Sequence, residues 1–142
     1  MSGKRIVDLY ELREVFSAEL HRRKRSSRPG DYAIRPGGEA TLYATIGAAK
    51  VCASLGLALG TAAEQREWRA AIWSFREPDG GFLGRNGHAA GMTVGALNLL
   101  GETEWQPVAG LAPLDPSALP AWLARFDPRR THKEFGCASL PI

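Results

Sequence analysis

Two arginines stand at equivalent places in the sequence, each in a loop that precedes an apolar segment. Arg35 lies in YAIRPG and Arg85 in FLGRNG, and both stretches follow the pattern aromatic-x-x-Arg-x-Gly. Because a guanidinium group can bind an anion through two parallel hydrogen bonds, the pair could clamp a diphosphate or a carboxylate. Each arginine could equally bond neighbouring carbonyl groups or pair with Asp31 or Glu39. The residue types leave both interpretations open.

Tyr43 and His88 lie close to these loops, at the start of the two apolar segments that follow them. An imidazole titrates near neutral pH, so His88 could act as a general acid or base. It could also simply face water at the first turn of a helix. We take His88 as the one candidate catalytic residue. The candidate ligand-binding residues are Arg35, Tyr43, Arg85 and His88.

The residues that usually hold metals are few and scattered. The chain has two cysteines, Cys52 and Cys137, too few for a disulfide scaffold or a cysteine-rich zinc site. Its aspartates do not cluster in the sequence. The sequence therefore predicts no metal and no cofactor. The aspartates are Asp8, Asp31, Asp79, Asp115 and Asp127.

The composition is that of an ordinary globular chain of 142 residues. Hydrophobic residues make up 44% and charged residues 23%, which excludes wholesale disorder. The net charge of +3 comes from residues 1–30, which carry eight Lys and Arg against four Asp and Glu. The basic run 22–25 could contact phosphate, nucleic acid or an acidic partner. Since residues 21–31 contain no aromatic side chain, we favour a solvated helix end and expect no nucleic-acid partner.

Hydrophobic periodicity predicts an all-α protein. Ile6, Leu9, Leu12, Phe16 and Leu20 recur at helical spacing and define a first, amphipathic helix. Segments 40–58 and 88–100 are apolar nearly all round, which is typical of buried helices. Segment 62–76 is amphipathic, and Thr61 followed by Glu64 has the spacing of a capping box at its start. A short fifth helix is expected from residue 115.

Residues 40–59 are long enough to cross a membrane, but their composition argues against it. Lys50 stands at the middle of the segment, and a central lysine costs roughly 2.5–3.5 kcal/mol on insertion. The N-terminus shows the pattern of a charged helix and not that of a signal peptide. We therefore expect a cytoplasmic protein with no membrane span.

The two apolar segments are copies of each other. Residues 45–48 read TIGA and residues 93–96, 48 positions later, read TVGA. The polar residues Lys50 and Asn98 fall at the same spacing. This repetition predicts one domain, 1–142, built from helix-loop-helix repeats at about 5–58, 62–101 and 115–142.

One repeat carries a family resemblance. Residues 68–85 (WRAAIWSFREPDGGFLGR) and 87–101 (GHAAGMTVGALNLLG) resemble the repeat of the prenyltransferase and squalene-cyclase (terpenoid cyclase) superfamily, the α/α toroids. In that family an aromatic outer helix runs through an Asp-Gly-Gly-aromatic turn into an inner helix that stops at Leu-Leu-Gly. The turn here is Asp79 to Phe82 and the stop is Leu99 to Gly101. Glycine suits such a turn because it tolerates positive φ.

The resemblance implies an incomplete toroid of three outer and two inner helices. Such a protein would bind an apolar ligand, with an isoprenoid diphosphate as one choice, and a second copy or a partner protein would cover its open inner face. The family's Asp-x-Asp-Asp acid motif is absent. Ala89 and Ala90 stand beside His88, where the family's zinc enzymes have other ligands. Whether the chain is an enzyme stays open.

Two other classes of function are compatible with these features. A non-catalytic helical scaffold for protein–protein interaction would also have an open apolar face. A fragment of a carbohydrate-acting (α/α) barrel would need a pair of carboxylates. Only Glu39 and Glu134 stand at loop ends in the sequence, so the support for a carbohydrate-acting enzyme is small.

Overall fold

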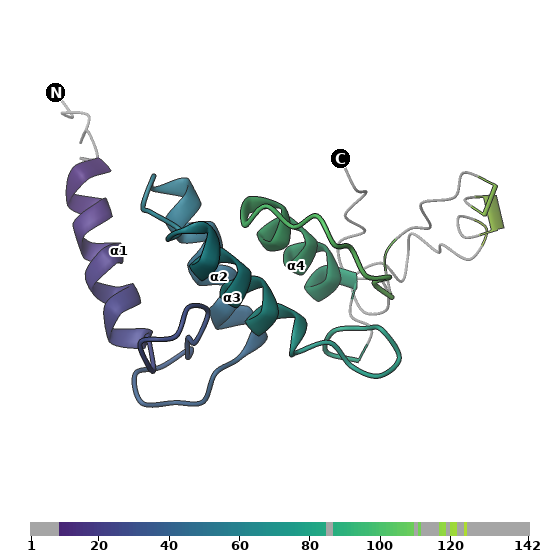
Figure 1. Ribbon diagram of the computed structural model, residues 1–142, viewed down its shortest axis with the longest axis horizontal. Helices are drawn as coiled ribbons and strands as arrows, with labels where there is room; N and C mark the ends of the chain where they lie inside the picture. The colour runs from purple at the N-terminus through teal and green to yellow at the C-terminus, as the bar shows by residue number, and fades with distance from the viewer. Residues whose placement is uncertain are drawn as a thin grey trace, which may run out of the picture.

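The computed structural model describes residues 9–84, 87–109, 111, 117–118, 120–121 and 124. This part of the chain forms four α helices and no strand (Figure 1). The predicted all-α class is confirmed. The predicted fifth helix and third repeat lie almost entirely outside the described residues. The helices are α1 (Leu9–Arg23), α2 (Leu42–Ser54), α3 (Ala62–Trp73) and α4 (Gly87–Leu99).

The apolar helices α2 and α4 lie side by side, as the sequence predicts, and theirs is the most extensive helix–helix contact. They run in the same direction, since Tyr43 meets His88 near their N-termini and Lys50 meets Met92 further along. Helix α3 runs back across this pair and packs against both helices (Figure 1). This arrangement is one helical hairpin, α3 and α4, added to a neighbouring apolar helix, α2.

The burial pattern of α2 recurs in α4 at the spacing of the sequence repeat. Five pairs of positions 48 residues apart are buried in both members. The two helices therefore present the same face to the rest of the core, and the repetition seen in the sequence is also a repetition of packing. The pairs are Leu42 and Ala90, Thr45 and Thr93, Ala48 and Ala96, Ala49 and Leu97, and Cys52 and Leu100.

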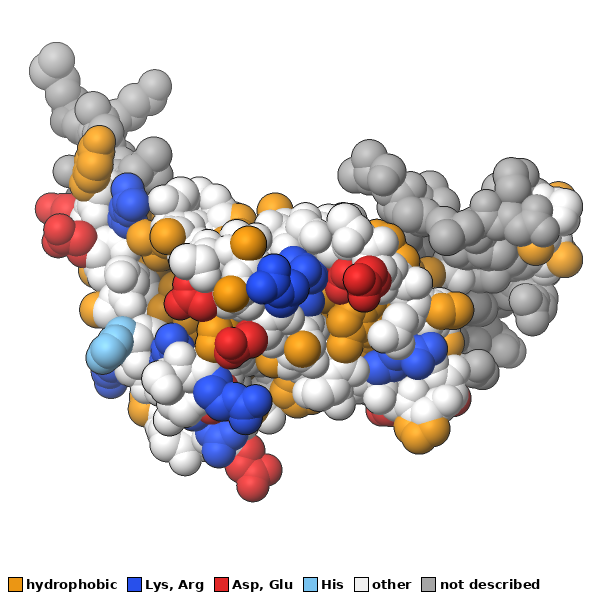
Figure 2. All heavy atoms as spheres, viewed as in Figure 1, with side chains coloured by type: hydrophobic (Ala, Val, Ile, Leu, Met, Phe, Trp, Pro, Cys, Tyr) orange, Lys and Arg blue, Asp and Glu red, His pale blue; other side chains and the backbone are white. Residues whose placement is uncertain are grey.

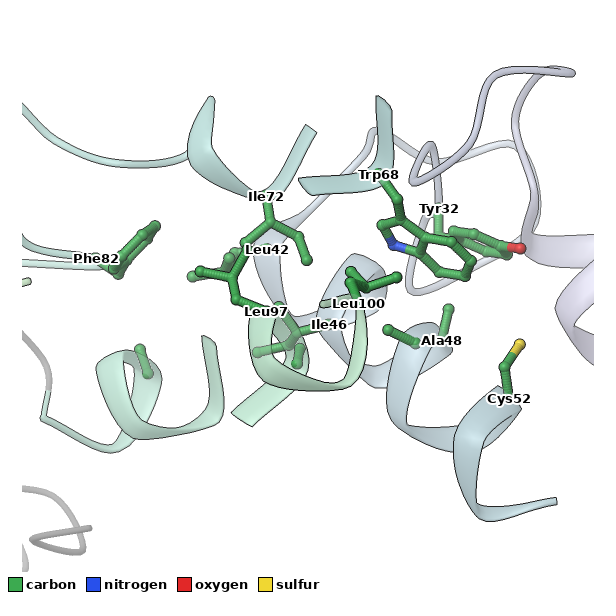
Figure 3. Packing of buried hydrophobic residues seen from close by; sticks show 13 residues of the cluster. Tyr32, Leu42, Ile46, Ala48, Cys52, Trp68, Ile72, Phe82, Leu97 and Leu100 are labelled. Carbon is green, nitrogen blue, oxygen red and sulfur yellow. The ribbon is translucent and has the colours of Figure 1, made fainter. Parts of the chain in front are cut away.

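Helix α3 supplies the large side chains that cover this small-residue layer. Trp68 and Ile72 point from α3 toward α2 and the end of α4 (Figure 3). The indole of Trp68 stacks on Tyr32, with ring centroids 5.5 Å apart. The connection between α1 and α2 is thereby tied to the same core.

The turn at 79–82 is built largely as the sequence predicts. The Asp79 carboxylate accepts a hydrogen bond from the Gly81 N–H at 2.8 Å, and Gly80 adopts φ +85°. Phe82 then enters the core, where it is fully buried, and its ring centroid lies 6.0 Å from that of Trp73. Positive φ is needed at Gly80 but not at Gly81.

Helix α2 ends earlier than the predicted residue 58. Gly56 adopts φ +61°, and the N–H groups of Gly56 and Leu57 bond back to Ala53 and Cys52 at 3.2 and 2.8 Å. This pairing is a Schellman motif, which requires left-handed backbone and stops the helix at Ser54. Gly101 ends α4 in the same way, as its Leu-Leu-Gly sequence predicts.

The predicted ends of two other helices are also displaced. Helix α3 stops at Trp73 and not at residue 76. Its start is correct: Thr61 and Glu64 exchange hydrogen bonds as a capping box. Helix α4 begins at Gly87, one residue before the predicted start.

Helix α1 stands to one side of the other three helices (Figure 1). Leu20 packs against the core, and the Arg13 guanidinium donates to the Gly56 carbonyl at 3.2 Å. The basic run ends α1, as predicted, and the charges of Arg22, Arg23 and Arg25 are paired locally. Glu19 binds Arg22 and Arg23 at 3.3 and 2.6 Å. No helix in the described part of the chain combines the length and apolarity that crossing a membrane requires.

Glu102 holds the segment after α4 against α3. Its side chain is only 5% exposed. The carboxylate accepts hydrogen bonds from the Trp73 indole at 2.6 Å and from the N–H groups of Thr103 and Glu104 at 2.9 Å. The Arg69 guanidinium lies 3.8 Å away. Burial by itself raises the pKa of Glu102, but these bonds and the nearby cation outweigh it and lower the pKa.

The lowered pKa of Glu102 predicts an acid-sensitive contribution to stability. A carboxylate with a lowered folded-state pKa stabilises the fold above its unfolded pKa of about 4.3 and loses that effect as the pH falls through the folded value. Glu102→Gln should therefore lower the free energy of unfolding by about 1–3 kcal/mol at pH 7. The gap from the unsubstituted protein should narrow at pH 3.

Guanidinium chloride denaturation followed by circular dichroism at both pH values measures this difference. Glu104→Gln is the control, because the Glu104 side chain is exposed and makes no hydrogen bond among the described residues. A difference that stays the same at pH 3 and pH 7 contradicts the prediction.

The buried turn aromatic gives a second stability prediction. Phe82→Ala removes a fully buried ring and should cost about 3–5 kcal/mol. Leu83→Ala, the next residue, alters a side chain that is 48% exposed and should cost much less. Urea denaturation of both variants tests the placement of the turn, and equal costs would contradict it.

Candidate functional site

The structure brings together two of the four residues that the sequence singles out. Tyr43, in the first turn of α2, and His88, in the first turn of α4, have ring centroids 6.4 Å apart. They meet because α2 and α4 run in the same direction with their N-termini at the same end. Both side chains are exposed, so a ligand could reach them.

Arg35 lies apart from this pair in the contacts that the structure gives. Its side chain is exposed and has no hydrogen-bond or ion-pair partner among the described residues. The alternative pairings with Asp31 and Glu39 are not formed, since Asp31 instead accepts hydrogen bonds from Arg25 and Ser26. Arg85 lies outside the described residues, so the proposed arginine clamp stays a prediction.

Lys50 joins the site although it is not among the predicted site residues. Its ammonium group donates to the Met92 sulfur at 3.0 Å and would lie 3.3 Å from a β-carbon placed on Gly95. It forms no ion pair with an acidic group in the described part of the chain. Burial lowers the pKa of Lys50. The signal in the sequence was a single charged residue inside an otherwise apolar segment.

Together these residues form what we call the α2–α4 face, made of Tyr43, Lys50, His88 and Met92. It offers an ammonium group, an imidazole and a phenol, and it contains no carboxylate. Such a set suits binding of an anion more than proton transfer between paired acids. No cluster of three His, Cys, Asp or Glu suitable for a metal ion occurs among the residues that the structure describes.

A groove adjoins this face on its α1 side. It has a volume of about 320 Å³, and Tyr43 belongs to both the groove and the α2–α4 face. Gly47 of α2 lines the groove and leaves space above the helix, since a β-carbon added there would meet no atom within 4 Å. We call it the α1–α2 groove. Its apolar lining includes Phe16, Leu20, Ile34, Tyr43, Ala44 and Val51.

Cys52 is a free cysteine, and its side chain is buried. Burial raises the pKa of its thiol, so the reactive thiolate is scarce at neutral pH. Burial, with a smaller effect from the Cys52 charge, also raises the pKa of Tyr32 to about 12. Both side chains belong to the buried hydrophobic cluster.

Comparison with protein-family models, with curated proteins and with solved structures finds no match for the chain. The geometry of the chain's own residues therefore carries the argument about function.

The environment of Lys50 predicts the direction of a pH effect. A lysine whose folded-state pKa is lowered destabilises the fold while it is charged, and this cost is relieved as the pH rises from the folded toward the unfolded pKa. Lys50→Met should therefore raise the melting temperature at pH 7, and the gain should shrink at pH 10. Calorimetric melting of both proteins measures it. A variant less stable than the unsubstituted protein at pH 7 contradicts the prediction.

Proposed function

We propose that the chain is a helical-repeat protein of the prenyltransferase and terpenoid-cyclase type, with an incomplete α/α toroid as its architecture. The parallel pair α2 and α4, with α3 running back across both, supports this proposal. The matched burial at a spacing of 48 residues supports it further. Helix α1 would be the outer helix of the first repeat and α3 that of the second.

The function that we infer is the binding of an apolar ligand, and the α1–α2 groove carries this inference. Its volume of about 320 Å³ falls at the lower end of the range of small-molecule pockets. Its lining is mainly apolar, and Tyr43 at its edge supplies a polar group. An isoprenoid chain matches these properties, because it is slender and apolar along its length.

The polar end of such a ligand would lie where basic groups are free to bind it. Arg35 follows Ile34, which lines the groove, and its guanidinium has no partner among the described residues. A diphosphate at Arg35 would form charge-assisted hydrogen bonds there. We assign His88 and Tyr43 to ligand binding and propose no catalytic step.

A second copy or a partner protein would cover the open side of the helices. Leu99 on α4 is 46% exposed and Tyr43 on α2 is 37% exposed. The scaffold function is the second candidate. It is favoured by α1, where Tyr10 and Val15 are 78% and 64% exposed. Exposed apolar side chains of this kind suit a docked protein as well as a ligand-bound repeat.

Filling the groove tests the proposed function. Gly47→Leu should place a side chain in the open space over α2 and weaken farnesol binding about tenfold or more, a loss of about 1.4 kcal/mol. Gly47→Ala is the matched control. It has the same gain in helix propensity, about 1 kcal/mol, but leaves most of the groove open.

Isothermal titration calorimetry with farnesol, farnesyl diphosphate and inorganic pyrophosphate distinguishes the parts of the ligand. Tighter binding of farnesyl diphosphate than of farnesol, reduced by Arg35→Ala, supports the polar contact. If farnesol binds neither the unsubstituted protein nor Gly47→Ala, the ligand-binding function is wrong and the scaffold function is preferred.

A further inference from the structure

A second, larger groove runs along the outward side of α3. It has a volume of about 560 Å³ and lies between α3 and the loop that joins α1 to α2. We call it the α3 groove. None of the candidate ligand-binding residues that the structure describes lies in it, although Arg25 of the basic run does, and it shares no lining residue with the α1–α2 groove. Its lining includes Arg28, Glu67, Ala70, Ala71, Ser74 and Phe75, together with Gly30 of the loop.

The loop wall of the α3 groove is held firmly against the helix at Gly30. A β-carbon at Gly30 would lie 2.8 Å from side-chain atoms of both Ala71 and Trp68, so only glycine permits this contact. Gly30 also adopts φ +77°, and its carbonyl accepts a buried hydrogen bond from the Thr45 hydroxyl at 2.9 Å. The wall is therefore preorganised, which lowers the entropic cost of binding.

Two arginines, Arg25 and Arg28, lie on the loop wall, and only Arg25 forms an ion pair among the described residues. Arg25 pairs with Asp31 at 3.3 Å, and the Ser26 hydroxyl donates to the other Asp31 oxygen at 2.6 Å. The backbone N–H of Arg28 donates to Ser26 at 3.2 Å, but the Arg28 guanidinium has no partner among the described residues. The Arg28 side chain is thus available to an anion, and its backbone is held by the bond to Ser26.

The helix wall adds an apolar surface and one negative charge. Ala70 and Ala71 are small, and Phe75 is half-buried beside them, so a flat group could lie on this surface. Glu67 forms no ion pair in the described part of the chain. Its charge repels an anion, which favours the placement of an anionic group at Arg28.

We propose that the α3 groove binds a small anionic molecule with a flat apolar body, such as an aromatic carboxylate or sulfonate. The anionic group bonds to Arg28, and the ring lies on Ala70, Ala71 and Phe75. Nucleic acid is a poorer occupant, because basic and acidic side chains are mixed on the face that carries α3 (Figure 2). A polyanion needs a surface of one sign.

The probe is 8-anilinonaphthalene-1-sulfonate, which joins a sulfonate to aromatic rings. Its binding is followed through the amide signals of Gly30 and Ser74 in two-dimensional NMR of ¹⁵N-labelled protein, so that binding elsewhere is not counted. Arg28→Ala should weaken binding about tenfold, the loss expected for one charge-assisted contact. Arg66→Ala, on an exposed α3 residue outside the groove, should leave it unchanged.

Two further substitutions test the other wall. Glu67→Gln should tighten binding by roughly twofold, because it removes a repelling charge near the surface. Ala70→Leu should fill the groove and weaken binding about tenfold, whereas Ala63→Leu, on an exposed site of the same helix outside the groove, should not.

The outcomes separate this site from the proposed function. Gly47→Leu fills the α1–α2 groove and should leave the Gly30 and Ser74 titrations unchanged. The proposal is overturned if the probe does not shift these signals, or if Arg28→Ala and Arg66→Ala bind it equally. Farnesol binding has no bearing on either result.

Discussion

The close packing of α2 against α4 is the constraint on which the described structure depends. These helices are rich in alanine and glycine, so they approach closely but contribute little bulk to the core. Their buried faces therefore need cover from larger side chains. Trp68, Ile72 and Phe82 provide that cover from α3 and the turn after it. A single amphipathic helix thus stabilises two apolar helices together.

The sequence predicted the parts of the fold that local chemistry determines. The capping box at Thr61, the Asp79 turn and the stop at Gly101 each depend on contacts within a few residues, and each was found as expected. The predicted end of α2 was wrong, because the apolar pattern continues past Gly56 to residue 58 whereas the helix stops at Ser54. Gly56 adopts a positive φ, which ends the helix although the residues after it are apolar. The sequence signal for this end was the glycine itself, within an apolar run.

The candidate site was harder to predict, because it depends on which helix faces meet. The meeting of Tyr43 and His88 follows from the parallel course of two helices far apart in the sequence. Lys50 was visible as an exception in an apolar segment, but its contact with Met92 depends on the register between α2 and α4. The basic run 22–25, which contributes Arg25 to the α3 groove, was the only sequence signal near it, since the walls come from a loop and a helix that no motif connects.

Gly30 has an effect on the molecule beyond its own position. Helix α1 packs little against the other helices, so its orientation depends mainly on the loop that joins it to α2. That connection is locked to α3 and to Thr45 at a point with no room for a methyl group. One glycine thus couples the geometry of both grooves: displacement of this loop would tilt α1 away from α2 and separate Arg28 from α3 in the same movement.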